Sequence, residues 1–185
     1  MLVKTYGSAV YGVEAITITV EVNIANGINF HLVGLPDSAV KESQQRIDAA
    51  LGNNGFKLPG KKITINMAPA DIRKEGSAYD LPLAIGILAS SQQINAPRLD
   101  EYLIMGELSL DGGLQPIRGA LPMAIKARED GFKAFILPEQ NAREAGVVNG
   151  IDIYGVQNLK EAISIVNETV APTPVVVDVK KVFEE

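Results

Sequence analysis

The first clear pattern in the chain is an alternation of apolar and polar residues over positions 16–24. A period of two predicts a β-strand with one face toward the core and one toward water. Asn26 and Gly27 follow, a pair that accepts the positive φ angles of a type I′ turn. Residues 28–32 alternate again, so we expect a β-hairpin, with His31 on the outward face of its second strand.

A helix, a strand and a buried helix are predicted next. Asp37 or Ser38 is a suitable N-cap for a helix that ends near Gly52. Residues 62–67 alternate as a strand does, and the apolar run over residues 79–92 predicts a helix that is buried on most sides.

The second half of the chain alternates between β and α patterns. We expect strands at residues 102–106, 113–116, 132–137 and 151–154, and helices at residues 119–130, 139–145 and 158–167. From Thr169 the composition changes, with two prolines before a β-branched run that is typical of a linker, leading either into an edge strand or toward a further module that this sequence does not contain. The interpretation is one domain over residues 1–168 followed by a linker over residues 169–185.

Composition narrows the classes of function. The 185 residues include no cysteine and one histidine, which excludes disulfide scaffolds, thiolate zinc sites and a cysteine nucleophile. The net charge of −5 argues against nucleic-acid binding by the whole surface but leaves room for a local basic patch. The start of the chain lacks the features of a signal peptide, and the longest apolar stretch, residues 81–89, is about half of a membrane span. We therefore expect a soluble, cytoplasmic protein without a membrane partner.

Residues 55–62 match the phosphate-binding pattern G-x-x-x-x-G-K in letters only. A P-loop needs Ser or Thr after the lysine to hold Mg²⁺, and Lys62 occupies that position. It must also lead from a strand into a helix, whereas this segment leaves a helix and enters a strand. We interpret it as a turn, and no cofactor is expected to bind there.

Ser77 precedes the predicted buried helix and has two interpretations. The first is an N-cap, and the second is a serine nucleophile activated by a lysine such as Lys74, Lys126 or Lys133. Nothing in the sequence places one of these lysines beside Ser77, and no G-x-S-x-G motif is present.

Two short basic segments are candidates for contact with nucleic-acid phosphates. The first contains Lys57, Lys61 and Lys62, and the second contains Arg73 and Lys74. Solvated turns are the alternative, because no aromatic residues that would stack on bases are interleaved with these side chains.

Three segments together resemble one protein family. Residues 33–43 (VGLPDSAVKES), 65–86 (INMAPADIRKEGSAYDLPLAIG) and 105–119 (MGELSLDGGLQPIRG) are similar to the N-terminal domain of the magnesium-chelatase-like AAA+ ATPases, the ComM/YifB family. That domain is in turn similar to the proteolytic domain of Lon proteases. The resemblance implies an α/β fold, a two-layer α+β sandwich like domain 2 of ribosomal protein S5.

The resemblance to Lon also bears on catalysis. Aligning the Lon motif K-D-G-P-S-A-G on Lys74, Glu75 and Gly76 puts Ala78 at the position of the catalytic serine. Ser77 then falls one position early, and Leu121 stands at the position of the catalytic lysine. We therefore expect no catalytic residue, because proton transfer requires direct hydrogen-bond reach.

Family resemblance further implies the setting of this domain. Relatives carry an AAA+ module that uses ATP and Mg²⁺, so we expect this chain to be an N-terminal fragment without a nucleotide site of its own. The resemblance implies a homo-oligomer, hexameric at full length, that drives DNA branch migration during recombination in natural transformation. The domain would aid ring assembly or DNA guidance. The alternatives are a Lon-like serine peptidase that uses Ser77 and, on the family name alone, insertion of magnesium into porphyrins.

Overall fold

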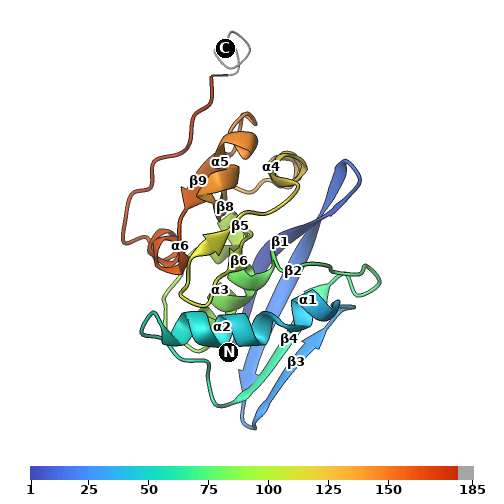
Figure 1. The fold of residues 1–185 in the computed structure, drawn as a ribbon, viewed down its shortest axis with the longest axis vertical. Coiled ribbons are helices and arrows are strands. Elements are labelled where there is room, and N and C mark those ends of the chain that lie inside the picture. The colour runs from blue at the N-terminus through green and yellow to red at the C-terminus, as the bar shows by residue number, and fades with distance from the viewer. Residues whose placement is uncertain (179–185) are drawn as a thin grey trace.

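The structure is a computed structural model in which residues 1–178 are described. It is a mixed α/β fold (Figure 1), so the predicted fold class is confirmed. The strands are β1 Leu2–Tyr11, β2 Glu14–Ala25, β3 Asn29–Val33, β4 Lys62–Ala68, β5 Tyr102–Ile104, β6 Glu107–Leu108, β7 Leu114–Gln115, β8 Ala134–Pro138 and β9 Asp152–Val156. The helices are α1 Ser38–Lys41, α2 Ser43–Gly52, α3 Asp80–Ser90, α4 Ala120–Glu129, α5 Glu139–Ala145 and α6 Leu159–Val166, with a 3-10 turn, η1, at Leu99–Glu101.

The first sheet has four strands in the order β1-β2-β4-β3. The predicted hairpin between β2 and β3 is wrong, because β4 lies between them. β4 pairs antiparallel with β2, Val22 opposite Ile65, and parallel with β3, Leu32 opposite Ile65. Residues 26–28 therefore form a wide connection to the far side of β4. The outward position predicted for His31 is confirmed, since this residue is exposed.

The strand β1 was not predicted from the sequence; it pairs along its whole length with β2. The tight turn of the real hairpin lies at Gly12–Val13, because Tyr11 pairs with Glu14. Thr5 and Ser8 are buried polar residues of β1, and they interrupt the alternation by which a strand is recognised.

The second sheet is parallel, in the order β5-β8-β9, and β6 and β7 form a short antiparallel ribbon beside it. Every residue of β8 is buried. The strands and helices predicted over residues 102–167 are present with shifted ends, and α5 has the predicted bounds.

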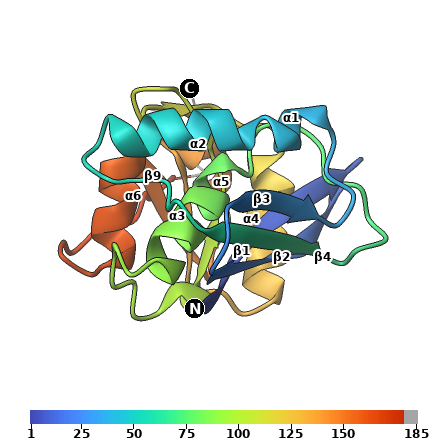
Figure 2. The same cartoon turned by 90° about the horizontal axis from the view of Figure 1, so that it is seen from below.

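Helix α3 lies at the centre of the molecule, against β1 and β2, with α2 packed along its side (Figure 2). All its residues are buried, as the apolar run predicted. At Gly86 the helix approaches the sheet so closely that a Cβ atom would lie 2.7 Å from Val22 Cγ2. This close approach holds the middle of α3 against the sheet; the candidate site lies at the N-terminal end of the same helix.

Residues 169–178 run along the outside of the domain without forming a helix or strand (Figure 1). The amide of Val175 donates a hydrogen bond of 2.8 Å to the carbonyl oxygen of Ile153 in β9. Because residues 169–178 form no strand, the predicted edge strand is wrong for this segment. The rest of the predicted linker, residues 179–185, lies outside the described residues. Within residues 1–178, no helix is long and apolar enough to cross a membrane.

Candidate functional site

A pocket of about 660 Å³ opens around Ser77, in front of the N-terminal end of α3. One wall is the end of β1, at Ser8 to Val10. The loop from Glu75 to Tyr79 forms the second wall. The remaining lining comes from Asp37, at the start of α1, and from three later segments, which contribute Met105, Glu107, Pro116, Ile117, Arg118 and Met123.

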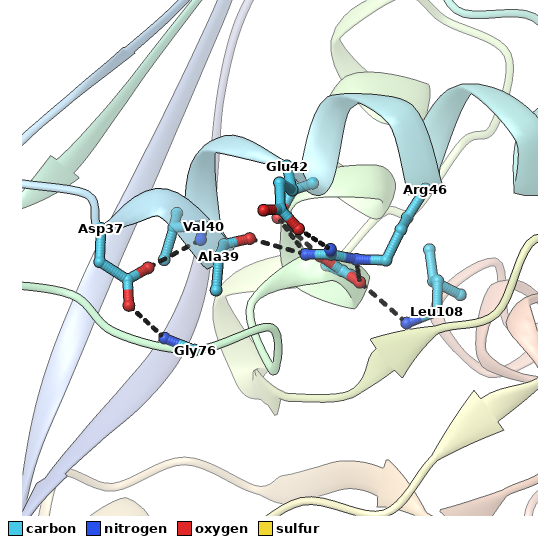
Figure 3. Close-up of polar contacts among 9 residues, drawn as sticks. Asp37, Ala39, Val40, Glu42, Arg46, Gly76 and Leu108 are labelled. Atoms are coloured by element: carbon cyan, nitrogen blue, oxygen red, sulfur yellow. Dashed lines mark hydrogen bonds and ion pairs between the residues drawn. The ribbon is translucent and has the colours of Figure 1, made fainter.

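Asp37 joins the start of α1 to the loop that carries Ser77 (Figure 3). Its Oδ1 accepts from the amide of Val40 at 2.8 Å, so it is the helix N-cap, and Oδ2 accepts from the amide of Gly76 at 3.1 Å. The predicted capping role of Asp37 is confirmed, with Ser38 as the first residue of the helix. Gly76 has a φ of +86°, a conformation that glycine adopts without the steric cost of a Cβ atom.

Lys74 lies in the interior beneath the same loop. Its side chain is fully buried, and Nζ donates to the carbonyl oxygens of Gly34, at 2.7 Å, and of Pro69. Burial lowers the pKa of its ammonium group, while Asp71 raises it by a smaller amount. The prediction that Lys74 belongs to an exposed basic segment is wrong, because its ammonium group is buried and donates hydrogen bonds to two loop carbonyl oxygens.

The Ser77 hydroxyl faces no hydrogen-bond partner among residues 1–178. The capping role predicted for it is wrong, since the residue before α3 is Tyr79 and no side chain caps the helix. The first amides of α3 bind carbonyl oxygens instead: Asp80 N donates to Ser77 O at 3.2 Å, and Leu81 N donates to Gly106 O at 3.0 Å.

Ser77 and Ala78 both line the pocket, but Leu121 does not. Leu121 lies in the first turn of α4, half-buried against the hydrophobic core. No lysine lines this pocket as described, and its one cationic residue is Arg118. A general base for Ser77 would have to be one of the carboxylates of Asp37, Glu75 and Glu107, of which Asp37 is already hydrogen-bonded to two amides.

A buried ion pair fixes the helix behind the pocket. The Asp80 carboxylate accepts from Arg46 Nε at 2.6 Å, Arg46 Nη2 at 3.0 Å, Ser43 Oγ at 2.6 Å and the amide of Leu108 at 3.0 Å. Figure 3 shows Arg46 extending from α2 with its guanidinium close to Glu42, with which it forms an ion pair of 3.7 Å. Burial raises the pKa of the Asp80 carboxyl, and the hydrogen bonds from Arg46, Ser43 and Leu108 oppose that rise. The cluster ties α2, α3 and β6 together.

The first basic segment lies at a different end of the molecule. Lys57, Lys61 and Lys62 are exposed, and none of them forms an ion pair with residues 1–178. Lys57 and Lys61 line a second hollow of about 490 Å³. The loop is held by Gln93, whose side chain exchanges two hydrogen bonds, of 3.0 and 2.8 Å, with the backbone of Lys57. Residues 53–61 leave α2 and enter β4, so the interpretation of the G-x-x-x-x-G-K segment as a turn is confirmed.

Arg73 is separate from that group. It lies in the loop after β4, whereas Lys62 begins this strand, and seven strand residues span about 20 Å. The Arg73 side chain is exposed and forms an ion pair of 3.4 Å with Glu75. The two basic segments therefore do not form one continuous surface patch. Within the described residues, no group of three or more His, Cys, Asp or Glu side chains is arranged so that it could hold a metal ion.

Sequence reasoning missed Arg118 and Glu107 as pocket residues. Glu107 lies in β6, and Arg118 follows β7, so each reaches the pocket only through a ribbon formed far along the chain from Ser77. The Asp80–Arg46 pair was also missed. The one signal of this pair in the sequence was Asp80, a charged residue in an otherwise apolar helical run.

Comparisons with known proteins place the chain among two groups of relatives. Residues 20–141 match the family described as subunit ChlI of Mg-chelatase. Competence protein ComM of Haemophilus influenzae is 44% identical over 167 residues, which cover 90% of this chain and 33% of that protein. The uncharacterized protein YifB of Escherichia coli is 48% identical over 143 residues, 77% of this chain and 28% of that protein.

Lon proteases are more distant matches. Lon protease 2 of Bacillus subtilis is 28% identical over 147 residues, which cover 78% of this chain and 26% of that protein. The chain thus spans about a third or less of the length of the curated relatives it matches.

Proposed function

Because the chain belongs to the family of subunit ChlI of Mg-chelatase, with relatives named ComM and YifB, we propose that it is a non-catalytic domain of a magnesium-chelatase-like AAA+ ATPase. In this proposal the domain helps to assemble the ATPase ring or to guide DNA through it, in a motor for branch migration and recombination. ATP and Mg²⁺ would act in the AAA+ module, and the assembled protein would be a homo-oligomer in the cytoplasm.

The non-catalytic part of the proposal is supported by the surroundings of Ser77. A serine nucleophile needs a base within hydrogen-bond reach, and the described lining of the pocket offers no lysine and no histidine. Lys74, the lysine nearest to Ser77 in sequence, is bound to the carbonyl oxygens of Gly34 and Pro69. The alternative of a serine peptidase would require rearrangement of that loop.

The DNA part is supported by the exposed loop lysines, and this observation carries the proposal. Lys57, Lys61 and Lys62 lie within six consecutive positions, exposed and without ion pairs to residues 1–178, in a chain with a net charge of −5. Phosphate contacts by lysine ammonium groups are the main source of non-specific DNA affinity. ComM of Haemophilus influenzae is named a competence protein, which fits a role in handling DNA.

Fluorescence anisotropy with a labelled DNA strand and its duplex, measured over a series of salt concentrations, tests the DNA contact. We expect binding at low salt that weakens as salt rises. The triple variant Lys57→Gln/Lys61→Gln/Lys62→Gln should reduce the slope of log K against log salt by roughly 2 to 3, since each phosphate contact contributes about 0.9. The matched control, Lys4→Gln/Lys41→Gln/Lys160→Gln, removes the same charge from exposed lysines elsewhere that also form no ion pair with residues 1–178.

Two results would count against DNA guidance. The first is an absence of binding at low salt, and the second is an equal loss of affinity in both triple variants. Either result would leave ring assembly as the proposed role of the domain. Analytical ultracentrifugation tests this role by measuring self-association, which should increase with protein concentration.

A further inference from the structure

Strand β3 forms one edge of the four-stranded sheet (Figure 1). It pairs in parallel with β4 from Asn29 to Val33 and with no other strand. Proteins usually protect such an edge with lysine, proline or a bulge, because its unpaired N–H and C=O groups can bind another strand. Residues 29–33 contain no lysine and no proline, and their pairing with β4 is continuous. This edge therefore lacks the usual protection.

The neighbouring ladders show which strand residues direct their backbone groups toward β3. The amide of Ser8 in β1 donates to Met105 Sδ at 3.4 Å, so its N–H points away from β2. Hydrogen-bonded and non-hydrogen-bonded pairs alternate along an antiparallel ladder, and the registers of β1–β2 and β2–β4 run without interruption. Counting along both registers, residues 63, 65 and 67 of β4 point toward β3.

Two residues of β3 then direct their backbone groups outward. Ile63 lies opposite Phe30, so its hydrogen bonds in the parallel ladder go to residues 29 and 31. Since the direction alternates along a strand, the N–H and C=O groups of Phe30 and Leu32 point away from β4. Within residues 1–178, no hydrogen-bond partner is present for these four groups.

Exposed apolar side chains lie at both ends of this edge. Ile28 is 86% exposed before the strand, and Val33 and Leu35 are half exposed at its end. Leu35 has a φ of +58°, which is unusual for a bulky residue, and its carbonyl oxygen accepts from the amide of Lys74 at 3.0 Å. The loop of Lys74 thus fixes the backbone that presents the Leu35 side chain to solvent.

We propose that the β3 edge pairs with the β3 edge of a second copy of this chain, antiparallel about a twofold axis at His31. Phe30 of each copy then lies opposite Leu32 of the other, and every outward N–H and C=O group of these residues gains a partner. The two His31 residues form the non-hydrogen-bonded pair at the centre, where opposite side chains lie closest.

The sequence of the edge favours a second copy as the occupant. Residues 26–36 carry no charged residue, so two chains with a net charge of −5 can meet there without apposing like charges. Antiparallel pairing also brings Ile28 of one copy to the same end of the paired strands as Val33 and Leu35 of the other.

The pairing differs from the ring assembly of the proposed function and does not depend on it. A twofold contact uses the same surface on both copies and closes at two, whereas a ring joins two different surfaces of each copy. The edge strand has five residues, and stable interfaces bury about 1,200–2,000 Å². We therefore expect a weak dimer that forms as protein concentration rises.

Sedimentation velocity over a series of concentrations measures the dimer, and two lysine substitutions test its register. His31→Lys places two ammonium groups opposite each other and should raise the dissociation constant about fivefold or more, because like charges directly opposite destabilise a strand pair. Asn29→Lys is the matched control, since it adds the same charge to the same face of β3 but faces Val33 of the other copy. Its effect should be clearly smaller.

Leu32→Pro removes an outward N–H, and Leu32→Ala is its control because it keeps the amide. Proline is tolerated at edge positions whose N–H is outside the ladder. Leu32→Pro should raise the dissociation constant about tenfold or more, since the dimer loses two hydrogen bonds, and clearly more than Leu32→Ala. If Leu32→Pro does not fold, hydrogen exchange in the unmodified chain is decisive: the amides of Phe30 and Leu32 should exchange more slowly as concentration rises, whereas the amide of His31, bound to β4, should not change.

The proposal is overturned if the chain stays monomeric at all concentrations, or if exchange at Phe30 and Leu32 does not depend on concentration. Equal effects of His31→Lys and Asn29→Lys would also overturn it. Species larger than a dimer that none of the β3 variants weakens would report association through another surface, as in ring assembly. Slower exchange at Phe30 and Leu32 caused only by an added unfolded protein, reduced and carboxymethylated lactalbumin, would assign the edge to a foreign strand instead.

Discussion

The Arg46 guanidinium holds the fully buried Asp80 carboxylate through two hydrogen bonds, Nε to Oδ2 at 2.6 Å and Nη2 to Oδ1 at 3.0 Å. This pair connects α2 to the first turn of α3, directly behind the loop that carries Ser77. The same carboxylate accepts from Ser43 and from the amide of Leu108, so it receives four hydrogen bonds in all. Neither residue of this ion pair lines the pocket, but the pair positions the helix that forms the back of it.

Removing one partner of this pair should destabilise the fold strongly. Arg46→Met leaves the Asp80 carboxylate buried without its cation, and breaking a buried pair in this way costs about 3–5 kcal/mol. Urea denaturation measures this cost as a fall in the free energy of unfolding.

Glu42→Gln is the matched control for Arg46→Met. The Glu42 carboxylate also lies near Arg46, at 3.7 Å, but its side chain is 69% exposed. An exposed pair of this kind contributes about 0–1 kcal/mol. Equal effects of the two substitutions would show that the Asp80 pair does not hold the helices together.

Lys74 should make stability depend on alkaline pH. Burial lowers the pKa of its ammonium group below the ordinary value of 10.5, so the folded chain releases this proton at a lower pH than the unfolded chain. Between the two pKa values the unfolded chain binds more protons, and the free energy of unfolding therefore rises with pH across that window. Above 10.5 the contribution is constant.

Lys74→Met should remove this rise and also leave two loop carbonyls without their donor. We expect a loss of about 1–3 kcal/mol at neutral pH. The stability gap between the unmodified protein and Lys74→Met should widen as pH approaches 10.5, in urea titrations at a series of pH values. A gap that does not change with pH would contradict the assignment of a lowered pKa to Lys74.

Local patterns in the sequence predicted most helices and strands but not how the strands pair. Asn26 and Gly27 have the chemistry of a tight hairpin turn, yet β4 enters the sheet between the two strands that they connect. The pairing of β4 with both β2 and β3 depends on residues about 40 positions away, which a turn signal cannot report. β1 was missed because buried Thr5 and Ser8 obscure its alternation.

The sequence predicted some residues of the candidate site but not how they are arranged. The sequence singled out Ser77 and Ala78, and both line the pocket. It also treated Lys74 as a surface residue, because nothing local shows that the carbonyl oxygens of Gly34 and Pro69 surround its ammonium group. Arg118 reaches the pocket through the β6–β7 ribbon, a contact that only the folded chain creates.

The absence of catalytic power at Ser77 is the central claim, and labelling with a fluorophosphonate probe tests it most directly. The experiment compares the unmodified chain with Ser77→Ala, with an active serine protease run alongside to verify the probe. We predict no labelling that depends on Ser77, because no lysine or histidine of the described pocket lies beside its hydroxyl. Covalent labelling that is present in the unmodified chain and lost in Ser77→Ala would contradict the account and favour a serine peptidase.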